Sequence, residues 1–457
     1  MTTANTTPPI PSFPPDFVWG AATASYQIEG AVHEDGRGES IWDRFSHTPG
    51  KVVNGDTGDV ADDHYHRWQD DIKLMQALGL QAYRFSIAWP RVIPDGGTQV
   101  NEAGLDFYDK LVDGLLAAGI TPWATLYHWD LPQPLEDAGG WINRATADAF
   151  VPYVEAVTRR LGDRVKHWIT LNEPWCSAFL GYQIGVHAPG RTNFPDALAA
   201  VHTLLLAHGK AVPIIRQNSP DAQVGITLNL AQTYPATESE ADRAAARRYD
   251  GYANRWFLDP LYGRGYPEDM AQLYGDMVPK TEQQDFDPIA AKTDFLGLNY
   301  YTPTIVRDGN DDSILLLSHA RLENVEFTAM DWAIVPQALR DQLVDISQRY
   351  PTGPLYITEN GAAYDDPPPT IENGERRVHD PERVNYYALH LAACRQAMDD
   401  GAPLKGYFAW SLMDNFEWAF GYTRRFGIVY VDFATQQRTI KDSGRWYRDV
   451  IAANAAK

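Results

Sequence analysis

The sequence predicts an α/β fold, a closed (β/α)8 TIM barrel with long rim loops at the C-terminal face of its strands. Eight short runs rich in β-branched and aromatic residues are mostly separated by helical stretches, a pattern typical of parallel βαβ units. Eight such units in series favour a closed barrel over an open sheet. No Gly-x-Gly-x-x-Gly follows the first run, which also disfavours a dinucleotide-binding sheet. At 457 residues the chain exceeds the usual size of one core, but such barrels run past ~400 residues as one unit.

Several predicted strands are introduced by similar features. An amphipathic helical stretch, such as 72–78 or 111–117, is followed by a Gly or Asp turn and a short apolar run that ends in a polar residue. The predicted strands span residues 17–22, 81–87, 121–127, 165–171, 223–229, 294–299, 354–358 and 404–410. The connections before the sixth and seventh strands are about 65 and about 55 residues long, more than one helix needs. We expect their polar or Pro-rich runs 307–313 and 365–370 to form rim loops that wall a pocket, although surface loops without a role explain part of this length equally well.

The two ends of the chain predict one domain after a short extension. Residues 1–16 are rich in Thr and Pro and are expected to be a flexible N-terminal extension, with a single barrel domain over residues 17–457. The extension has no basic n-region and no apolar h-region, so we expect no signal peptide. No window of ~18 uninterrupted apolar residues is present, so we expect no membrane span. The expected location is the cytoplasm.

Charge and cysteine content exclude several classes of partner. The net charge of −21 argues against nucleic acid or an anionic membrane and suits a neutral small molecule, although solubility alone explains it as well. Cys176 and Cys394 are too few for a disulfide scaffold and are expected to be free thiols.

Motifs for a metal or a cofactor are not found in the sequence. His64 and His66 would point to different faces of a helix, and no paired-Cys, His-Glu-x-x-His or phosphate-binding Gly motif appears. We therefore expect neither a metal nor a cofactor.

Two glutamates stand where predicted strands end. Residues 169–174 read Ile-Thr-Leu-Asn-Glu-Pro and residues 356–361 read Tyr-Ile-Thr-Glu-Asn-Gly, so Glu173 and Glu359 each follow a β-branched run and precede a helix-breaking or turn residue. Hydrolysis of a glycosidic bond needs two such carboxyl groups. Each motif alone has an ordinary explanation, since Glu before Pro often ends an element and Asn-Gly is a common turn.

The other strand ends carry residue types that suit a sugar site. Planar amides and carboxylates bind hydroxyl groups, and Trp stacks on the apolar face of a pyranose ring. In chain order these residues are Gln27, Glu29, Arg84, His128, Trp129, Asp130, Asn172, Asn229, Asn299, Tyr301, Asn360, Trp410, Glu417 and Trp418. Arg84 lies between Tyr83 and Phe85 in a strand, and a buried Arg needs a carboxylate partner. That partner is either Glu359, which the positive charge would keep ionised, or any other of the chain's 60 acidic residues in a structural ion pair.

Together these segments resemble glycoside hydrolase family 1, the β-glucosidase family with a (β/α)8 barrel, from about residue 17 to residue 447. The matching segments, in the order of the family, are residues 17–30, 83–91, 128–132, 170–174, 299–301, 357–361 and 410–418. The resemblance implies that Glu173 is the acid/base and Glu359 the nucleophile of a retaining double displacement. It places Asn299 and Tyr301 beside the nucleophile and Trp410 below the sugar.

The resemblance also implies the remaining substrate contacts. Around the terminal sugar it places Gln27, His128, Trp129, Asn172, Glu417 and Trp418. It assigns Trp332 to stacking on the leaving group, with Cys176 near that entrance. Glu173 is not the Gln of plant thioglucosidases, and Glu417 with Phe426 on the last rim loop replaces the phosphate-binding residues of the 6-phospho-sugar branch.

The expected function is therefore that of an exo-acting β-glucosidase. Its expected partner is a small-molecule β-glucoside (cellobiose, a short oligosaccharide, or an aryl or alkyl glucoside), and the protein is expected to be a monomer or a homo-oligomer. Alternatives are a preference for β-galactosides or β-fucosides, transglycosylation, or a sugar-binding relative without chemistry. The intact pair of Glu173 and Glu359 argues against the last.

Overall fold

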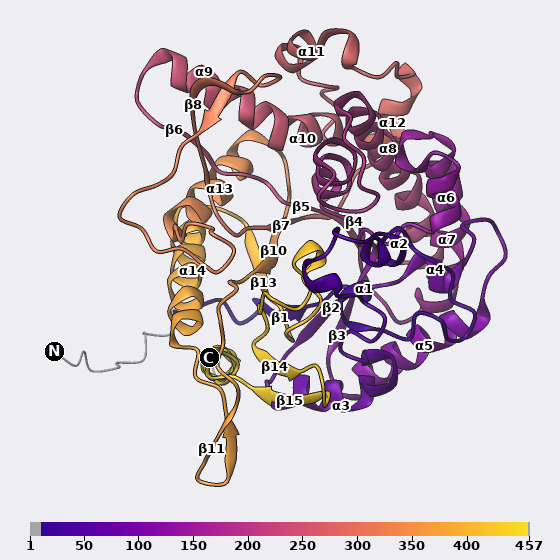
Figure 1. Ribbon diagram of the computed structural model, residues 1–457, viewed down its shortest axis with the longest axis vertical. Coiled ribbons are helices and arrows are strands. Elements are labelled where there is room, and N and C mark those ends of the chain that lie inside the picture. The colour runs from indigo at the N-terminus through magenta and orange to yellow at the C-terminus, as the bar shows by residue number, and fades with distance from the viewer. Residues whose placement is uncertain (1–10, 456–457) are drawn as a thin grey trace.

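The computed structural model describes residues 11–455, and its centre is a closed barrel of eight strands (Figure 1). The order around the barrel is β1-β13-β10-β7-β5-β4-β3-β2, and every neighbouring pair is parallel. These strands are β1 (Val18–Ala22), β2 (Ala82–Ser86), β3 (Thr121–Tyr127), β4 (His167–Asn172), β5 (Gln223–Leu228), β7 (Phe295–Asn299), β10 (Leu355–Asn360) and β13 (Leu404–Trp410). They coincide with the predicted runs to within two residues at each end, and the predicted barrel is confirmed.

Helices surround the barrel in the order that the sequence indicates (Figure 1). α7 shows why they form, because Phe150, Val154, Val157 and Leu161 recur at helical spacing and are all buried. The long helices are α3 (His64–Ala77), α5 (Glu102–Ala117), α7 (Ala145–Leu161), α8 (Phe194–Asn218), α9 (Glu240–Asp250), α13 (Pro336–Arg349), α14 (Pro381–Asp399) and α15 (Asp442–Ala455). The shorter ones are α1 (Ser25–Ile28), α2 (Ile41–His47), α4 (Trp89–Val92), α6 (Gln133–Asp137), α10 (Trp256–Leu261), α11 (Glu268–Tyr274) and α12 (Phe286–Ile289).

The long connections contain small sheets of their own. β6 (Thr233–Pro235), β8 (Thr304–Asp312) and β9 (Leu317–His319) form one, β14 (Val429–Asp432) pairs with β15 (Gln437–Ile440), and β11 (Thr370–Glu372) pairs with β12 (Glu375–Arg377) in a hairpin that projects from the body (Figure 1). Residues 307–313, expected to be a loop, therefore lie mostly in a strand. The polar residues are tolerated because β8 pairs with β9 while much of it remains exposed.

An aromatic layer fills the amino-terminal half of the barrel. The ring of Trp123 stacks on His167 with 4.2 Å between centroids and touches Phe295, Tyr356 and Phe408 edge-on. Two strand glycines make room for these rings, since a Cβ at Gly225 would lie 2.4 Å from Phe295 and one at Gly20 would lie 2.4 Å from Phe408. The barrel is closed at this end, and its polar side chains are left for the opposite rim.

Near the N-terminus, the packed body begins before the predicted boundary at residue 17. Phe13 is buried against Phe17 and Trp19, and its backbone N–H donates to Asn454 Oδ1 at 2.8 Å. Residues 1–10 of the predicted extension lie outside the described residues. Among the described residues one helix, α8, has the length and apolar character of a membrane span, and 78% of its most apolar window is buried inside the protein.

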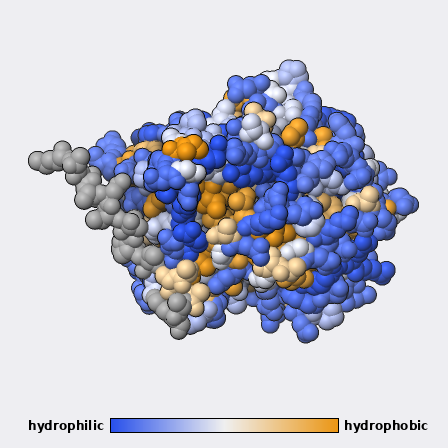
Figure 2. Space-filling model, turned by 90° about the horizontal axis from the view of Figure 1, so that it is seen from below, coloured by the Kyte–Doolittle hydropathy of each residue, from blue (hydrophilic) through white to orange (hydrophobic). Residues whose placement is uncertain are grey.

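The protein surface matches the charged composition. The face shown in Figure 2 is largely hydrophilic, with apolar residues gathered in a limited central area. Cys176 and Cys394 are both buried and are not bonded to each other, as expected.

Candidate active site

The carboxyl ends of the barrel strands bring the predicted residues together in one buried site. Arg84 lies in β2, Asn172 and Glu173 at the end of β4, and Glu359 near the end of β10. His128 and Trp129 follow β3, and Tyr301 follows β7, whose last residue is Asn299. All are buried except Tyr301, which is half-buried.

Glu359 is paired with a cation, as the sequence suggested. Arg84 Nη1 donates to Glu359 Oε1 at 2.6 Å, and Tyr301 Oη donates to Oε2 at 2.7 Å. Burial raises the pKa of Glu359, while the Arg84 charge and the hydrogen bond from Tyr301 act in the opposite direction. The Arg84 side chain is only 1% exposed, so water screens its attraction to the Glu359 carboxylate very little.

Glu173 has different neighbours. Its Oε1 accepts from Asn299 Nδ2 at 2.6 Å and its Oε2 lies 3.0 Å from the Cys176 thiol, with no ion pair to a cation among residues 11–455. Burial, and next the charge of Glu359, raise the pKa of Glu173 to about 8. The acid form of Glu173 is therefore favoured relative to that of an ordinary glutamate. Asn299 Nδ2 also donates to Asn172 Oδ1 at 3.0 Å, so this amide links Glu173 to a residue that Arg84 holds.

Arg84 also fixes the direction of a chain of hydrogen bonds. Its guanidinium can only donate, so Asn172 Oδ1, at 2.6 Å from Nη2, must accept. Asn172 Nδ2 then donates to His128 Nε2 at 2.9 Å. The pKa of His128 is lowered by burial and by the Arg84 charge, so its ring is neutral. Its remaining proton must be on Nδ1, which is buried and has no partner among the described residues and is therefore free to donate to a ligand.

Indoles and unpaired polar atoms complete the site. The ring centroids of Trp129 and Trp418 lie 4.5 Å apart. The imidazole centroid of His128 lies 6.0 Å from the ring centroids of both Trp410 and Trp418. Gln27 donates from Nε2 to Asn415 Oδ1 at 3.0 Å, while its Oε1 and Glu417 Oε2 have no hydrogen-bond partner among residues 11–455. Burial, followed by the charges of Glu359 and Glu173, raises the pKa of Glu417 to about 8. Apolar rings beside unpaired donors and acceptors suit a ligand with a hydrophobic face and many hydroxyls.

The backbone is strained at three of these residues. Trp129, Glu173 and Trp418 have φ angles of 77°, 45° and 47°, in the left-handed region that side chains other than glycine rarely adopt. Such conformations cost ~1–3 kcal/mol each and persist where surrounding packing holds them, frequently at functional sites. No motif in the sequence signals this.

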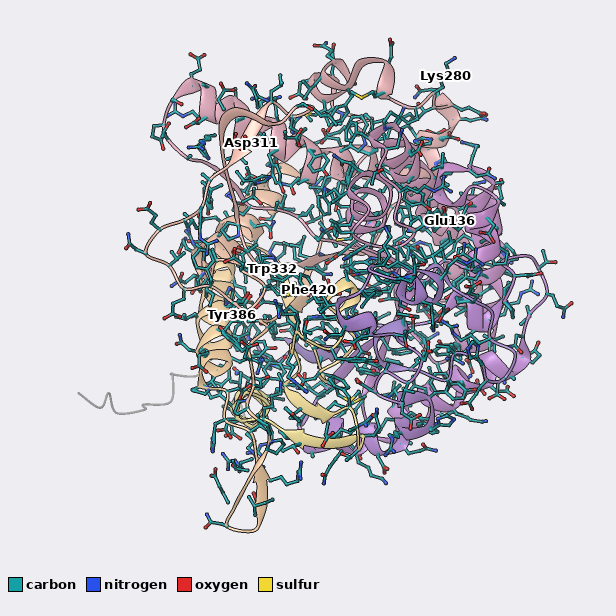
Figure 3. The ribbon with its side chains drawn as sticks, viewed as in Figure 1. Glu136, Lys280, Asp311, Trp332, Tyr386 and Phe420 are labelled. Carbon is teal, nitrogen blue, oxygen red and sulfur yellow. The ribbon has the colours of Figure 1, made fainter. Side chains whose placement is uncertain are left out.

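Trp332 lies toward the outside of the site. It is half-buried and packs against Tyr301 and Phe426 at 5.1 and 6.1 Å between centroids. It also borders a surface groove of about 310 Å³ that includes Thr302, Phe327 and Arg321. Figure 3 shows Trp332 and the exposed Phe420 near the centre of the view. The residues to which the resemblance gives a role therefore form two groups, the buried pocket and the aromatic group of Tyr301, Trp332 and Phe426. Three other strand-end candidates have structural partners instead: Glu29 is bonded to Arg91 and Tyr108, Asp130 to Ser25, and Asn360 to Tyr386 and Tyr407.

Two further residues were not predicted as site residues. His187 is half-buried and packs against Trp42, Trp129 and Trp418, at 5.3 to 6.3 Å between centroids, and desolvation by these rings lowers its pKa to about 3. The Cys176 thiol, which was expected only near the entrance for the leaving group, is hydrogen-bonded to Glu173. Both follow β4 rather than ending a strand, so the strand-end pattern does not identify them. No group of three or more potential metal ligands occurs among the described residues.

Comparisons with known proteins agree with this geometry. The model of the family described as glycosyl hydrolase family 1 matches residues 10–456. The chain is 48% identical to β-glucosidase A of Thermotoga maritima over 450 residues, 97% of this chain and 99% of that protein. The solved structure of the AHE enzyme from Alicyclobacillus herbarius is similar with a TM-score of 0.94 at 53% identity, covering 98% of this chain and 99% of that one. The β-glucosidase of Thermotoga maritima in complex with deoxynojirimycin has a TM-score of 0.93 at 48% identity, covering 97% of this chain and 99% of that one.

Proposed function

The chain belongs to glycosyl hydrolase family 1 and is a glycosidase, and on this premise we propose that it is a retaining exo-β-glucosidase. Its substrates are the terminal, non-reducing β-D-glucosyl residues of cellobiose, short oligosaccharides and aryl or alkyl β-glucosides. The observation that supports this best is the contrast between the two buried glutamates. One is paired with Arg84 and Tyr301, and the other has no cationic partner among the described residues and a pKa raised to about 8.

The first step uses both glutamates in these states. The Glu359 carboxylate attacks the anomeric carbon while Glu173 gives its proton to the glycosidic oxygen. The bond between that carbon and the oxygen breaks, the aglycone leaves as an alcohol, and an ester forms with Glu359. Tyr301 and Arg84 hold the attacking carboxylate in place.

The second step reverses the role of Glu173. Ester formation removes the charge of Glu359, which is the second-largest cause of the raised pKa of Glu173. The pKa of Glu173 then falls, so the residue can act as a base and take a proton from water. This water attacks the anomeric carbon, releases glucose with its original configuration and restores Glu359 as a carboxylate.

The unpaired atoms of the site support recognition of one terminal sugar through its hydroxyl groups. His128 Nδ1–H donates to one sugar hydroxyl, Gln27 Oε1 accepts from another, and Glu417 Oε2 bonds a third. Trp410 and Trp418 supply the apolar surface for the ring. Trp332, outside this pocket, stacks on the leaving group. The complex of the Thermotoga maritima β-glucosidase with deoxynojirimycin supports a small sugar-like ligand here.

The configuration of the first product tests the proposal. With an aryl β-glucoside, NMR spectra recorded during the first turnovers are expected to show β-glucose before mutarotation forms the α anomer. α-Glucose as the first product would reject the retaining mechanism. In parallel, kcat/KM for matched aryl β-glucosides, β-galactosides and β-fucosides should be highest for the glucoside, and a higher value for either of the others would reject the assigned sugar.

Replacing Arg84 with Met is expected to change the pH profile as well as the rate. Glu359 must be ionised to attack, so activity is lost as pH falls through its pKa. Without the Arg84 charge that pKa rises, and the acidic limb of kcat/KM should move up by ~1–2 pH units. Arg91→Met is the matched control, since Arg91 is also fully buried and paired with a glutamate, Glu29, at 3.1 Å. The Arg91→Met protein should be less stable but keep the acidic limb of kcat/KM at the wild-type pH. Equal pH profiles of kcat/KM for Arg84→Met and wild type would contradict the proposal that Arg84 keeps Glu359 ionised.

A further inference from the structure

The Cys176 thiol is placed against Glu173 by the turn at the end of β4. The backbone N–H of Cys176 donates to the carbonyl of Glu173 at 2.9 Å, and the thiol lies 3.0 Å from Glu173 Oε2. On the other side Asn229, just after β5, donates from Nδ2 to Cys176 Sγ at 3.4 Å. Cys176 is only 7% exposed. Burial raises the pKa of the thiol well above its usual value, so sulfur keeps its proton.

The two oxygens of Glu173 differ in what their neighbours can do. Asn172 Oδ1 accepts from Arg84, so the Asn299 amide that bonds it at 3.0 Å must present its NH2 group. The same NH2 group donates to Glu173 Oε1, and the amide oxygen of Asn299 accepts from Thr358 Oγ1 at 2.8 Å. Asn299 therefore cannot turn round to accept a proton from Oε1. The proton of the acid form belongs on Oε2, the oxygen beside Cys176.

A thiol can act in both directions, because S–H is a weak donor and sulfur a weak acceptor. We propose that Cys176 is a positioning residue that reverses its hydrogen bond to Glu173 during turnover. It accepts the Oε2–H proton while Glu173 is an acid and donates its own S–H once Glu173 is a carboxylate. The inference rests on the proposed acid/base role of Glu173. The transferred proton moves from Oε2 to the glycosidic oxygen, and the thiol proton stays on sulfur throughout.

The weakness of sulfur as an acceptor is what makes this arrangement useful. A bound glycosidic oxygen accepts a hydrogen bond better than sulfur does, so substrate can take over the Oε2 proton at little cost. After the transfer, the new carboxylate is not left without a donor on Oε2, since the S–H turns toward it. An apolar side chain of similar size could do neither.

Cys176→Val tests the donor half of the reversal. Loss of the S–H bond to the carboxylate should move the basic limb of kcat/KM for an aryl β-glucoside upward by about half to one pH unit. Cys176→Ser retains a group that donates and accepts, and should leave the limb in place or lower it. Cys394→Val makes the same change at the other buried cysteine, in α14, and should leave the limb unchanged. A basic limb of Cys176→Val that coincides with wild type would overturn the proposal.

Infrared spectroscopy tests both halves without turnover, and also serves if Cys176→Val fails to fold. In the Cys394→Val protein a single thiol remains, so its S–H stretching band reports Cys176 alone. The band should move to lower frequency as pH rises through the basic limb, and Glu173→Gln should abolish this movement. A band that does not respond to pH would overturn the proposal.

Glu173→Ala separates failure of this inference from failure of the proposed function. If the basic limb persists in Glu173→Ala, the limb does not belong to Glu173, and both the acid/base role and the inference are rejected. If the limb disappears in Glu173→Ala but Cys176→Val leaves it in place, the inference alone is rejected.

Discussion

Glu359→Gly is expected to lower kcat/KM for an aryl β-glucoside by at least about four orders of magnitude, because the attacking atom is lost. Azide should restore much of this activity. The shortened side chain leaves space, and Arg84 with Tyr301, which held the carboxylate at 2.6 and 2.7 Å, would attract a small anion to the same place. Azide would then attack from the nucleophile's side and give α-glucosyl azide, the inverted product.

The control for this experiment is Glu323→Gly. Glu323 is exposed on a rim segment, so this change should leave the rate near wild type, with or without azide. Glu359→Gly with near wild-type activity would show that another group is the nucleophile. Recovery with β-glucosyl azide as the product would show that azide enters from the other side of the sugar.

Glu173→Ala is expected to cause a loss that depends on the leaving group. For cellobiose, whose leaving alcohol must be protonated, the first step should slow by ~10²–10⁴-fold. For an activated dinitrophenyl glucoside the first step should change little, since the phenolate leaves without a proton. The slow second step, which lacks its base, should then be accelerated by azide, and the product should be β-glucosyl azide.

The two substrates control for each other within one variant. General damage to the fold or to sugar binding would lower the rates for both substrates alike. Equal losses for cellobiose and the dinitrophenyl glucoside would show that Glu173 is not the acid. The anomeric form of the azide product also separates the two glutamates, since Glu359→Gly should give α and Glu173→Ala should give β. The same form from both variants would contradict the division of roles.

The barrel, and a carboxylate partner for Arg84 with Glu359 as one candidate, were predictable from the sequence because each follows from a local rule. β-Branched runs between amphipathic helices indicate parallel strands, and parallel strands in a barrel end at one rim. A buried Arg in an apolar strand needs a carboxylate, and Glu359 stood at the end of another strand. The structure places the two 2.6 Å apart. The roles of Glu173 and Glu359 themselves remain predictions until the variants are measured.

Other features were outside the reach of such rules because they depend on how separate loops pack. Residues 307–313 read as a loop by composition, yet β9 pairs with them. His187 joins the aromatic wall only because its loop folds back over Trp129 and Trp418. The contact between Cys176 and Glu173 depends on a tight turn in which Glu173 adopts a φ of 45°, a conformation that its residue type does not favour.

The aromatic layer around Trp123 has a consequence for how this protein can change over evolutionary time. Trp123, His167, Phe295, Tyr356 and Phe408 anchor the strands at the end opposite the chemistry. Trp332 lies instead on the rim connection that contains β8 and β9. Given the role proposed for Trp332, mutation of that connection would change the preferred leaving group while the anchor preserves the scaffold. The residues that can vary and the residues that hold the strands together therefore lie at opposite ends of the barrel.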